Sequence, residues 1–77
     1  MKVENENAFI SLNIGVITIS DTRNKKNDKS GDFLSQAIND AKHCLIDRRI
    51  IPDDIREIRG TIKEWVVTNN FDAIITT

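Results

Sequence analysis

Hydroxyls and carboxylates follow three short apolar runs of this chain. The runs cover residues 14–19, 46–51 and 73–75, and the polar residues directly after them include Ser20, Asp21, Thr22, Asp53, Thr76 and Thr77. Such oxygens can hydrogen-bond a polar ligand or hold a hydrated metal ion such as Mg²⁺. Asp21 also has a simpler interpretation, because an aspartate at this point can merely start a turn.

Asp53 is the most informative of these carboxylates. Asp54 can cap the helix that follows, so Asp53 is a second carboxylate at the end of the run, next to the rigid Pro52. The pattern predicts that Asp53 could ligate Mg²⁺ through oxygen. The alternative is that both acids simply interact with the positive end of the helix dipole.

Ser30 and Gly31 open the first predicted helix, where free backbone N–H groups attract anions. Gly31 would allow a phosphate to approach closely. The local sequence alone favours the alternative, an ordinary cap formed by Ser30. Neither GxGxxG nor GxxxxGK[ST] is present, so no dinucleotide fold and no nucleotide P-loop is indicated.

His43 and Cys44 are adjacent but are predicted to be structural. Neighbouring side chains on a strand point to opposite faces, and these two lie at the start of a strand, away from the expected ligand edge. With one cysteine in the chain, no internal disulfide is possible, and a reducing, cytoplasmic setting fits best.

The elements that must position these residues alternate between strands and helices. Strands are predicted at residues 14–19, 44–50 and 72–76. One helix is predicted to begin at Ser30, and a second to begin at Asp54 and end at about residue 68. The apolar stripes expected to face the sheet are Phe33, Leu34, Ala37, Ile38 and Ala41 on the first helix and Ile55, Ile58, Ile62, Trp65 and Val66 on the second. Gly60 suggests that the second helix approaches the sheet closely.

The predicted fold is a three-layer α/β, doubly wound parallel sheet. Right-handed crossovers and a central first strand place the β-α-β-α-β strands in the order 2-1-3. The charged second strand then lies at the sheet edge. The chain reverses direction between the first and third strands, and ligands bind at such switch points.

Size and charge limit the function classes. The chain has 77 residues and a formal net charge of −1, so we expect one small domain, with neither nucleic acid nor a membrane as partner. Residues 1–12 are predicted to be a loose lead-in, and residues 13–77 form the domain. The polar start at residues 1–7 does not resemble a signal peptide.

Four segments in register resemble the MoaB/Mog family of molybdenum-cofactor biosynthesis proteins, which are built on the molybdopterin-binding domain. The segments are residues 14–23, 28–34, 50–53 and 73–77, so the likeness covers nearly the whole chain from Ile14 to Thr77. It implies a doubly wound domain that binds molybdopterin and that assembles into a trimer or a dimer of trimers (a hexamer). Active members adenylylate molybdopterin with ATP and Mg²⁺ and are therefore nucleotidyltransferases.

The resemblance assigns roles to individual positions. Asp53 matches the aspartate that the family associates with metal-dependent catalysis. The positions that match ligand-binding segments are Ser20, Asp21, Thr22, Ser30, Gly31, Thr76 and Thr77. Lys42 stands where the family usually has a glycine at the end of the first helix.

The family's glycine-rich loop would come after Thr77, and its second catalytic aspartate after that loop. We therefore expect a truncated or incompletely represented reading frame, with adenylylation a property of the complete protein. Two alternatives stay open: a non-catalytic pterin-binding or assembly module, and a phosphate-sensing regulatory domain. The second is less favoured, because Asp21 is a single acid where receiver-type domains have a pair.

Overall fold

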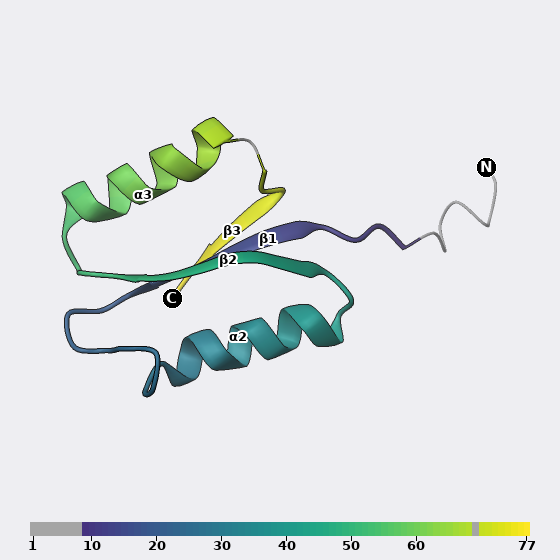
Figure 1. Ribbon diagram of the computed structural model, residues 1–77, viewed down its shortest axis with the longest axis horizontal. Coiled ribbons are helices and arrows are strands. Elements are labelled where there is room, and N and C mark those ends of the chain that lie inside the picture. Colours follow the sequence, from purple (N-terminus) through teal and green to yellow (C-terminus); the bar gives the residue numbers. More distant parts are fainter. Residues whose placement is uncertain (1–8, 69) are drawn as a thin grey trace.

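The computed structural model describes residues 9–68 and 70–77 and has the predicted α/β architecture. In chain order, the elements are β1 (Asn13–Ile19), α2 (Lys29–Asp40), β2 (Cys44–Ile51), α3 (Ile55–Thr68) and β3 (Ala73–Thr76). The three strands are parallel and lie in the order β2-β1-β3, which confirms the expected topology (Figure 1). Of the predicted lead-in, residues 1–8 lie outside the described part.

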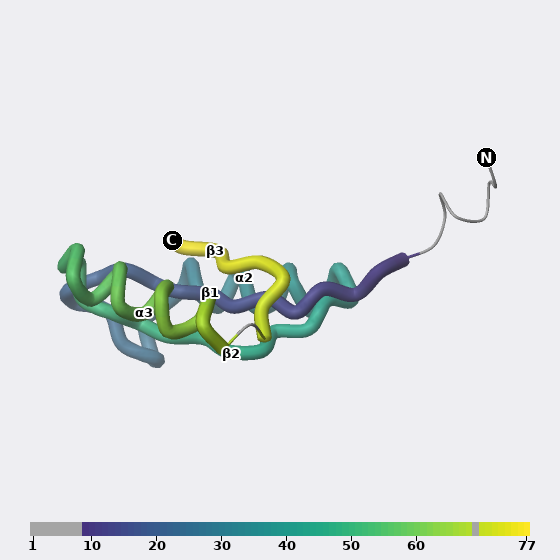
Figure 2. Tube along the Cα trace, turned by 90° about the horizontal axis from the view of Figure 1, so that it is seen from above, coloured from purple at the N-terminus to yellow at the C-terminus, as the bar shows by residue number. Residues whose placement is uncertain are grey.

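The central strand β1 supplies both halves of the core. Ile14 and Val16 pack with Ile38 of α2 on one face, whereas Ile17 packs with Trp65 of α3 on the other. This alternation follows from the two-residue period of a strand. The two helices therefore cover opposite faces of the sheet. In Figure 1, α3 lies above the strands and α2 below them, and Figure 2, seen from above, shows α3 in front of β1.

Gly15 is required by the close packing of aromatic side chains against β1. The rings of Trp65 and Phe71 stack with their centroids 4.5 Å apart, and a Cβ added at Gly15 would collide with both. Gly60 differs, because a Cβ there would meet nothing within 4 Å. The expectation that Gly60 lets α3 approach the sheet was therefore wrong.

The predicted apolar stripes were too wide. Phe33, Ile55 and Val66 are 73%, 69% and 63% exposed, and Ala37 is also exposed, whereas Ile38 and Trp65 are buried. A sheet of three strands contacts only a narrow strip of each helix, so side chains at the margins of a stripe stay in solvent. Asp54 does cap α3, since its carboxylate accepts a hydrogen bond from the Arg56 N–H at 2.8 Å.

A bulge changes the pattern of the edge strand β2. The pairing with β1 skips Ile46, which leaves this residue without a partner and 45% exposed. The extra residue brings Leu45 and Arg48 to the same face, towards α2, although a simple alternation places them on opposite faces.

Neither described helix has the length and apolar character needed to cross a bilayer.

The end of α2 has an unfavourable backbone conformation at Lys42. Its φ is 66°, the one positive φ of a non-glycine residue in the part that the structure describes. Glycine is usual at this position after a helix because it has no Cβ to clash. The positive φ is thus a physical reason for the glycine that the resemblance implies at this position.

Candidate functional site

The carboxyl ends of β1 and β2 are joined by a contact between two of the predicted site residues. The backbone N–H of Asp53 donates to Oδ1 of Asp21 at 3.0 Å. Beneath this contact, the Ser20 N–H donates to the carbonyl of Ile51 at 2.9 Å. Asp21 and Asp53 are both exposed, so their carboxylates are accessible at the rim of the sheet.

The predicted threonines of β3 lie at the same rim. Thr77 donates its N–H to the Ile17 carbonyl at 3.0 Å and accepts from the Ile19 N–H at 2.8 Å. These bonds extend the ladder between β1 and β3 beyond the end of β3. Thr76 and Thr77 are both exposed.

Ser20 shapes the loop that follows β1. Its Oγ accepts hydrogen bonds from the N–H groups of Thr22 at 3.2 Å and Arg23 at 3.1 Å. The Ser20 hydroxyl therefore acts on the backbone of its own loop, as serine does in turns. Thr22 stays exposed beside Asp21.

The helix start differs from the prediction at Ser30 and Gly31. Asp28, not Ser30, is the N-cap of α2, and its Oδ1 accepts the Gly31 N–H at 3.1 Å. Gly31 is buried, and a Cβ there would collide with the Asp28 carboxylate. Ser30 Oγ instead accepts from Nη1 of Arg23 at 2.6 Å. Asp28 therefore already provides an anion at this helix end.

Asp28 is the main residue that the sequence interpretation missed. The strongly polar run at residues 20–29 gives no sign of a core residue, but Asp28 within it is fully buried. Its Oδ2 accepts from Thr18 Oγ1 and from Arg48 Nη2, each at 2.9 Å. Arg48 Nη2 also contacts Oδ1 of Asp32 at 2.7 Å. The sequence signal was an aspartate placed three residues before a glycine at a helix start, the spacing of an N-cap.

The charges in this cluster stabilise each other. Burial alone would raise the pKa of Asp28, but the hydrogen bonds from Arg48, Thr18 and Gly31 outweigh it and lower that pKa below its ordinary value of 3.8. The carboxylates of Asp28 and Asp32 raise the pKa of Arg48. Both members of the Asp28–Arg48 pair are therefore charged at neutral pH.

His43 is structural, as predicted. Its Nδ1 accepts the Leu12 N–H at 2.9 Å, and its ring lies 5.2 Å from that of Phe9. The neighbouring Cys44 lies 3.7 Å from the Ser11 hydroxyl, at the amino end of β2. Both residues are at the opposite end of the strands from Asp21 and Asp53.

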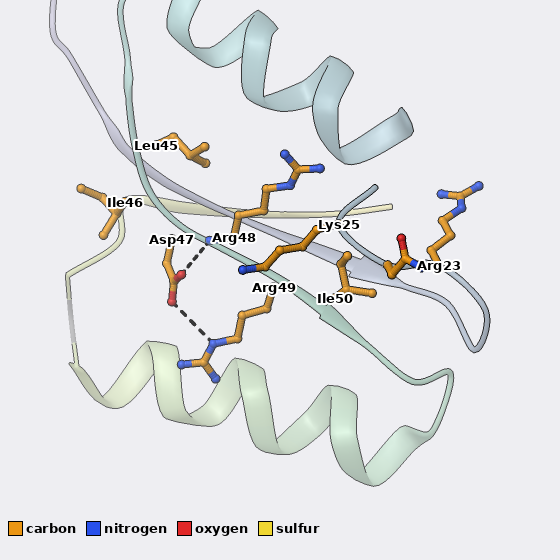
Figure 3. A pocket seen from close by; sticks show the side chains of 9 residues that line it. Arg23, Lys25, Leu45, Ile46, Asp47, Arg48, Arg49 and Ile50 are labelled. Atoms are coloured by element: carbon orange, nitrogen blue, oxygen red, sulfur yellow. Dashed lines mark hydrogen bonds and ion pairs between the residues drawn. The ribbon is translucent and has the colours of Figure 1, made fainter. Parts of the chain in front are cut away.

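An open hollow of about 780 Å³ lies along the outer edge of β2 and beside loop residues 23–25, and none of the predicted site residues lines it (Figure 3). Its cationic side chains are Arg23, Lys25, Arg48 and Arg49. Three of these are already paired: Arg23 and Arg48 with Asp28, and Arg49 with Glu64 at 2.6 Å. The ion pairs neutralise much of the positive charge of the hollow.

The rim can contribute part of a Mg²⁺ site. Mg²⁺ commonly binds one or two carboxylates and completes its octahedron with waters and substrate phosphates. The exposed carboxylates of Asp21 and Asp53 fit that requirement in residue type. Across residues 9–68 and 70–77, no three His, Cys, Asp or Glu side chains form a group that could hold a metal.

The model of a family described as a probable molybdopterin binding domain matches residues 15–77. The chain belongs to this family. The matched residues contain all five elements of the fold except the first two residues of β1.

Curated relatives of this molybdopterin-binding-domain chain share one description. Molybdenum cofactor biosynthesis protein B of Escherichia coli (strain K12) is 26% identical over 69 residues, which cover 90% of this chain and 41% of the relative. The protein of that name from Staphylococcus epidermidis is 38% identical over 69 residues, covering 86% and 39%. That of Bacillus anthracis is 31% identical over 61 residues, covering 79% and 36%. The chain thus spans about 40% of the length of these relatives.

Proposed function

We propose that the chain acts in molybdenum cofactor biosynthesis by binding molybdopterin at the carboxyl ends of its strands. The observation that carries the proposal is the contact of 3.0 Å between Asp53 and Asp21. It brings polar groups from two loops together at the carboxyl ends of the parallel strands, the side of a doubly wound sheet on which ligands usually bind. Membership of the molybdopterin-binding domain family supports the choice of ligand.

We further propose that the complete protein adenylylates molybdopterin with Mg-ATP. In this chain, Asp53 would hold Mg²⁺ with Asp21 beside it, and the hydroxyls of Thr22, Thr76 and Thr77 would hydrogen-bond the ligand. Mg²⁺ would neutralise the negative charge that develops on the transferring phosphate group. The support for the role of Asp53 is its exposed carboxylate, which no hydrogen bond within the described residues engages.

Isothermal titration of the 77-residue chain with molybdopterin, and separately with Mg-ATP, tests the binding proposal. We expect heat with molybdopterin, and a second, Mg²⁺-dependent binding event with ATP. A chain that is folded by circular dichroism but releases no heat with either ligand would contradict the proposal. Repeating the ATP titration in excess chelator isolates the contribution of the metal.

A non-catalytic pterin-binding or assembly role is the second candidate. The observation in its favour is that Asp21 uses one carboxylate oxygen to hold the loop of Asp53, which is a positioning task. Release of pyrophosphate from ATP in the presence of molybdopterin separates the two functions. Pterin binding without pyrophosphate release by the complete protein would favour the binding module.

We also propose a homo-oligomer, a trimer or hexamer, in a cytoplasmic setting. Large exposed side chains support self-association: Phe33, Ile55, Val66 and Val67 are each more than 60% exposed. Apolar surface of this kind often marks protein interfaces. Light scattering coupled to size-exclusion chromatography measures the mass in solution, and a monomer at high concentration would argue against the oligomer.

A further inference from the structure

The buried carboxylate of Asp28 closes the base of the loop that carries several predicted ligand-binding residues. The loop leaves β1 after Ile19 and enters α2 at Lys29. Asp28 Oδ2 accepts the Thr18 hydroxyl at 2.9 Å, so the end of the loop is fastened beside its beginning. The same carboxylate caps α2 through the Gly31 N–H.

Arg48 connects this closure to the neighbouring strand. Its Nη2 contacts both the carboxylate of Asp28 at 2.9 Å and the backbone carbonyl of Asp28 at 3.2 Å. Since β2 also carries the loop of Asp53, Arg48 links the two loops that meet at the rim.

The middle of the loop is held by a second arginine. Arg23 Nη1 donates to Ser30 Oγ at 2.6 Å and lies 3.9 Å from Oδ1 of Asp28. The Arg23 backbone N–H donates to Ser20 Oγ. Arg23 therefore links the turn at Ser20 to Asp28 and to the start of α2.

We propose that Asp28 and Arg48 are positioning residues for ligand binding, which hold the loop of residues 20–27 in one conformation. They act through Thr18, Gly31 and Arg23 and do not contact the ligand themselves. The inference rests on the proposed function, because the loop that they hold is the proposed pterin-binding loop.

Backbone ¹⁵N relaxation of residues 20–27 tests the positioning without any ligand. We expect order parameters near those of rigid backbone, about 0.8, in the unsubstituted chain and values below about 0.6 in Asp28→Asn. Ile38→Ala is the control, because it weakens the packing of α2 on β1 without touching the loop. Equal loss of order in both variants, or unchanged order in Asp28→Asn, would overturn the proposal.

Ligand affinity provides the second readout. Below the unfolding temperature of each variant, Asp28→Asn should raise the Kd for molybdopterin by about tenfold or more, and Ile38→Ala should not. An equal loss of molybdopterin affinity in both variants would mean that Asp28 stabilises the fold without positioning the loop. If the unsubstituted chain binds no molybdopterin, the proposed function fails, and the relaxation data still decide whether Asp28 positions the loop.

Arg48→Lys and Asp32→Asn complete the design. Arg48→Lys keeps the charge but loses the planar guanidinium, so it should loosen the loop even if Asp28→Asn does not fold. Asp32 is the more exposed acidic partner of Arg48 and lies outside the closure, so Asp32→Asn should leave the loop rigid. A rigid loop in Arg48→Lys would remove Arg48 from the proposal.

Discussion

The bond between Asp21 and Asp53 uses the side chain of the first residue and the backbone of the second. Asp53 donates its N–H to the Asp21 carboxylate at 3.0 Å, and its own carboxylate, exposed at the rim, has no hydrogen bond within residues 9–68 and 70–77. The two aspartates therefore have separable tasks. Removing the Asp53 side chain leaves the contact in place, whereas removing that of Asp21 breaks it.

We predict that Asp53→Ala in the complete protein abolishes adenylylation while sparing pterin binding. The substitution removes the proposed Mg²⁺ ligand at an exposed position, so the free energy of unfolding should change by less than about 0.5 kcal/mol. Pyrophosphate release and isothermal titration with molybdopterin measure the two effects. Unchanged turnover would exclude Asp53 from the mechanism.

We predict that Asp21→Ala, in contrast, lowers both the stability of the chain and its affinity for the pterin. Loss of this solvent-exposed hydrogen bond should lower the free energy of unfolding by roughly 0.5–1.5 kcal/mol, the range of an ordinary hydrogen bond. Urea denaturation measures this loss. Pterin affinity should fall as well, because the loop of Asp53 is released, and Asp53→Ala provides the matched comparison.

Lys42→Gly should stabilise the chain. Lys42 has a φ of 66°, a conformation that costs a side-chain-bearing residue about 1 kcal/mol or more. Glycine also makes the unfolded chain more flexible, which offsets part of this gain. Urea denaturation should therefore show a free energy of unfolding that is higher by about 0.5–1 kcal/mol. Ala37→Gly, at an exposed position within α2, is the control and should destabilise by about 1 kcal/mol. Equal effects at both positions would contradict this explanation.

The two glycines Gly60 and Gly15 should respond in opposite ways to alanine. Gly60→Ala places a methyl group in open space on a helix and should stabilise by about 0.5–1 kcal/mol. Gly15→Ala drives a methyl group into Trp65 and Phe71, and such overpacking costs about 1–3 kcal/mol. Thermal unfolding of both variants checks the pair, and a stable Gly15→Ala would show that the aromatic stack can move.

Stability should fall in acid because of Asp28. Its pKa in the folded chain lies below the ordinary value of 3.8, so at acidic pH the unfolded chain binds more protons than the folded one. The stabilisation is therefore fully present above about pH 4 and is lost as the pH falls through the folded pKa. Melting temperatures of Asp28→Asn and of the unsubstituted chain, measured from pH 7 to pH 2, should differ at neutral pH and become similar at acidic pH. Parallel curves would contradict this assignment.

Local sequence was sufficient for the parallel sheet and for which strand lies at its centre. Residues 14–19 are apolar on both faces, and only a strand covered on both sides can bury such a run. The alternating charges of β2 likewise indicated its place at the edge. Polar residues after each strand then had to meet at one rim, because parallel strands end on the same side.

The tertiary structure decided which polar and apolar residues are buried. Asp28 lies in a strongly polar segment, and only the approach of Arg48 and Thr18 from two strands makes its burial favourable. Phe33 has the character of a core residue, but the narrow sheet offers it no surface to cover. Burial depends on what distant segments bring to a position, and a local pattern of residue types does not contain that information.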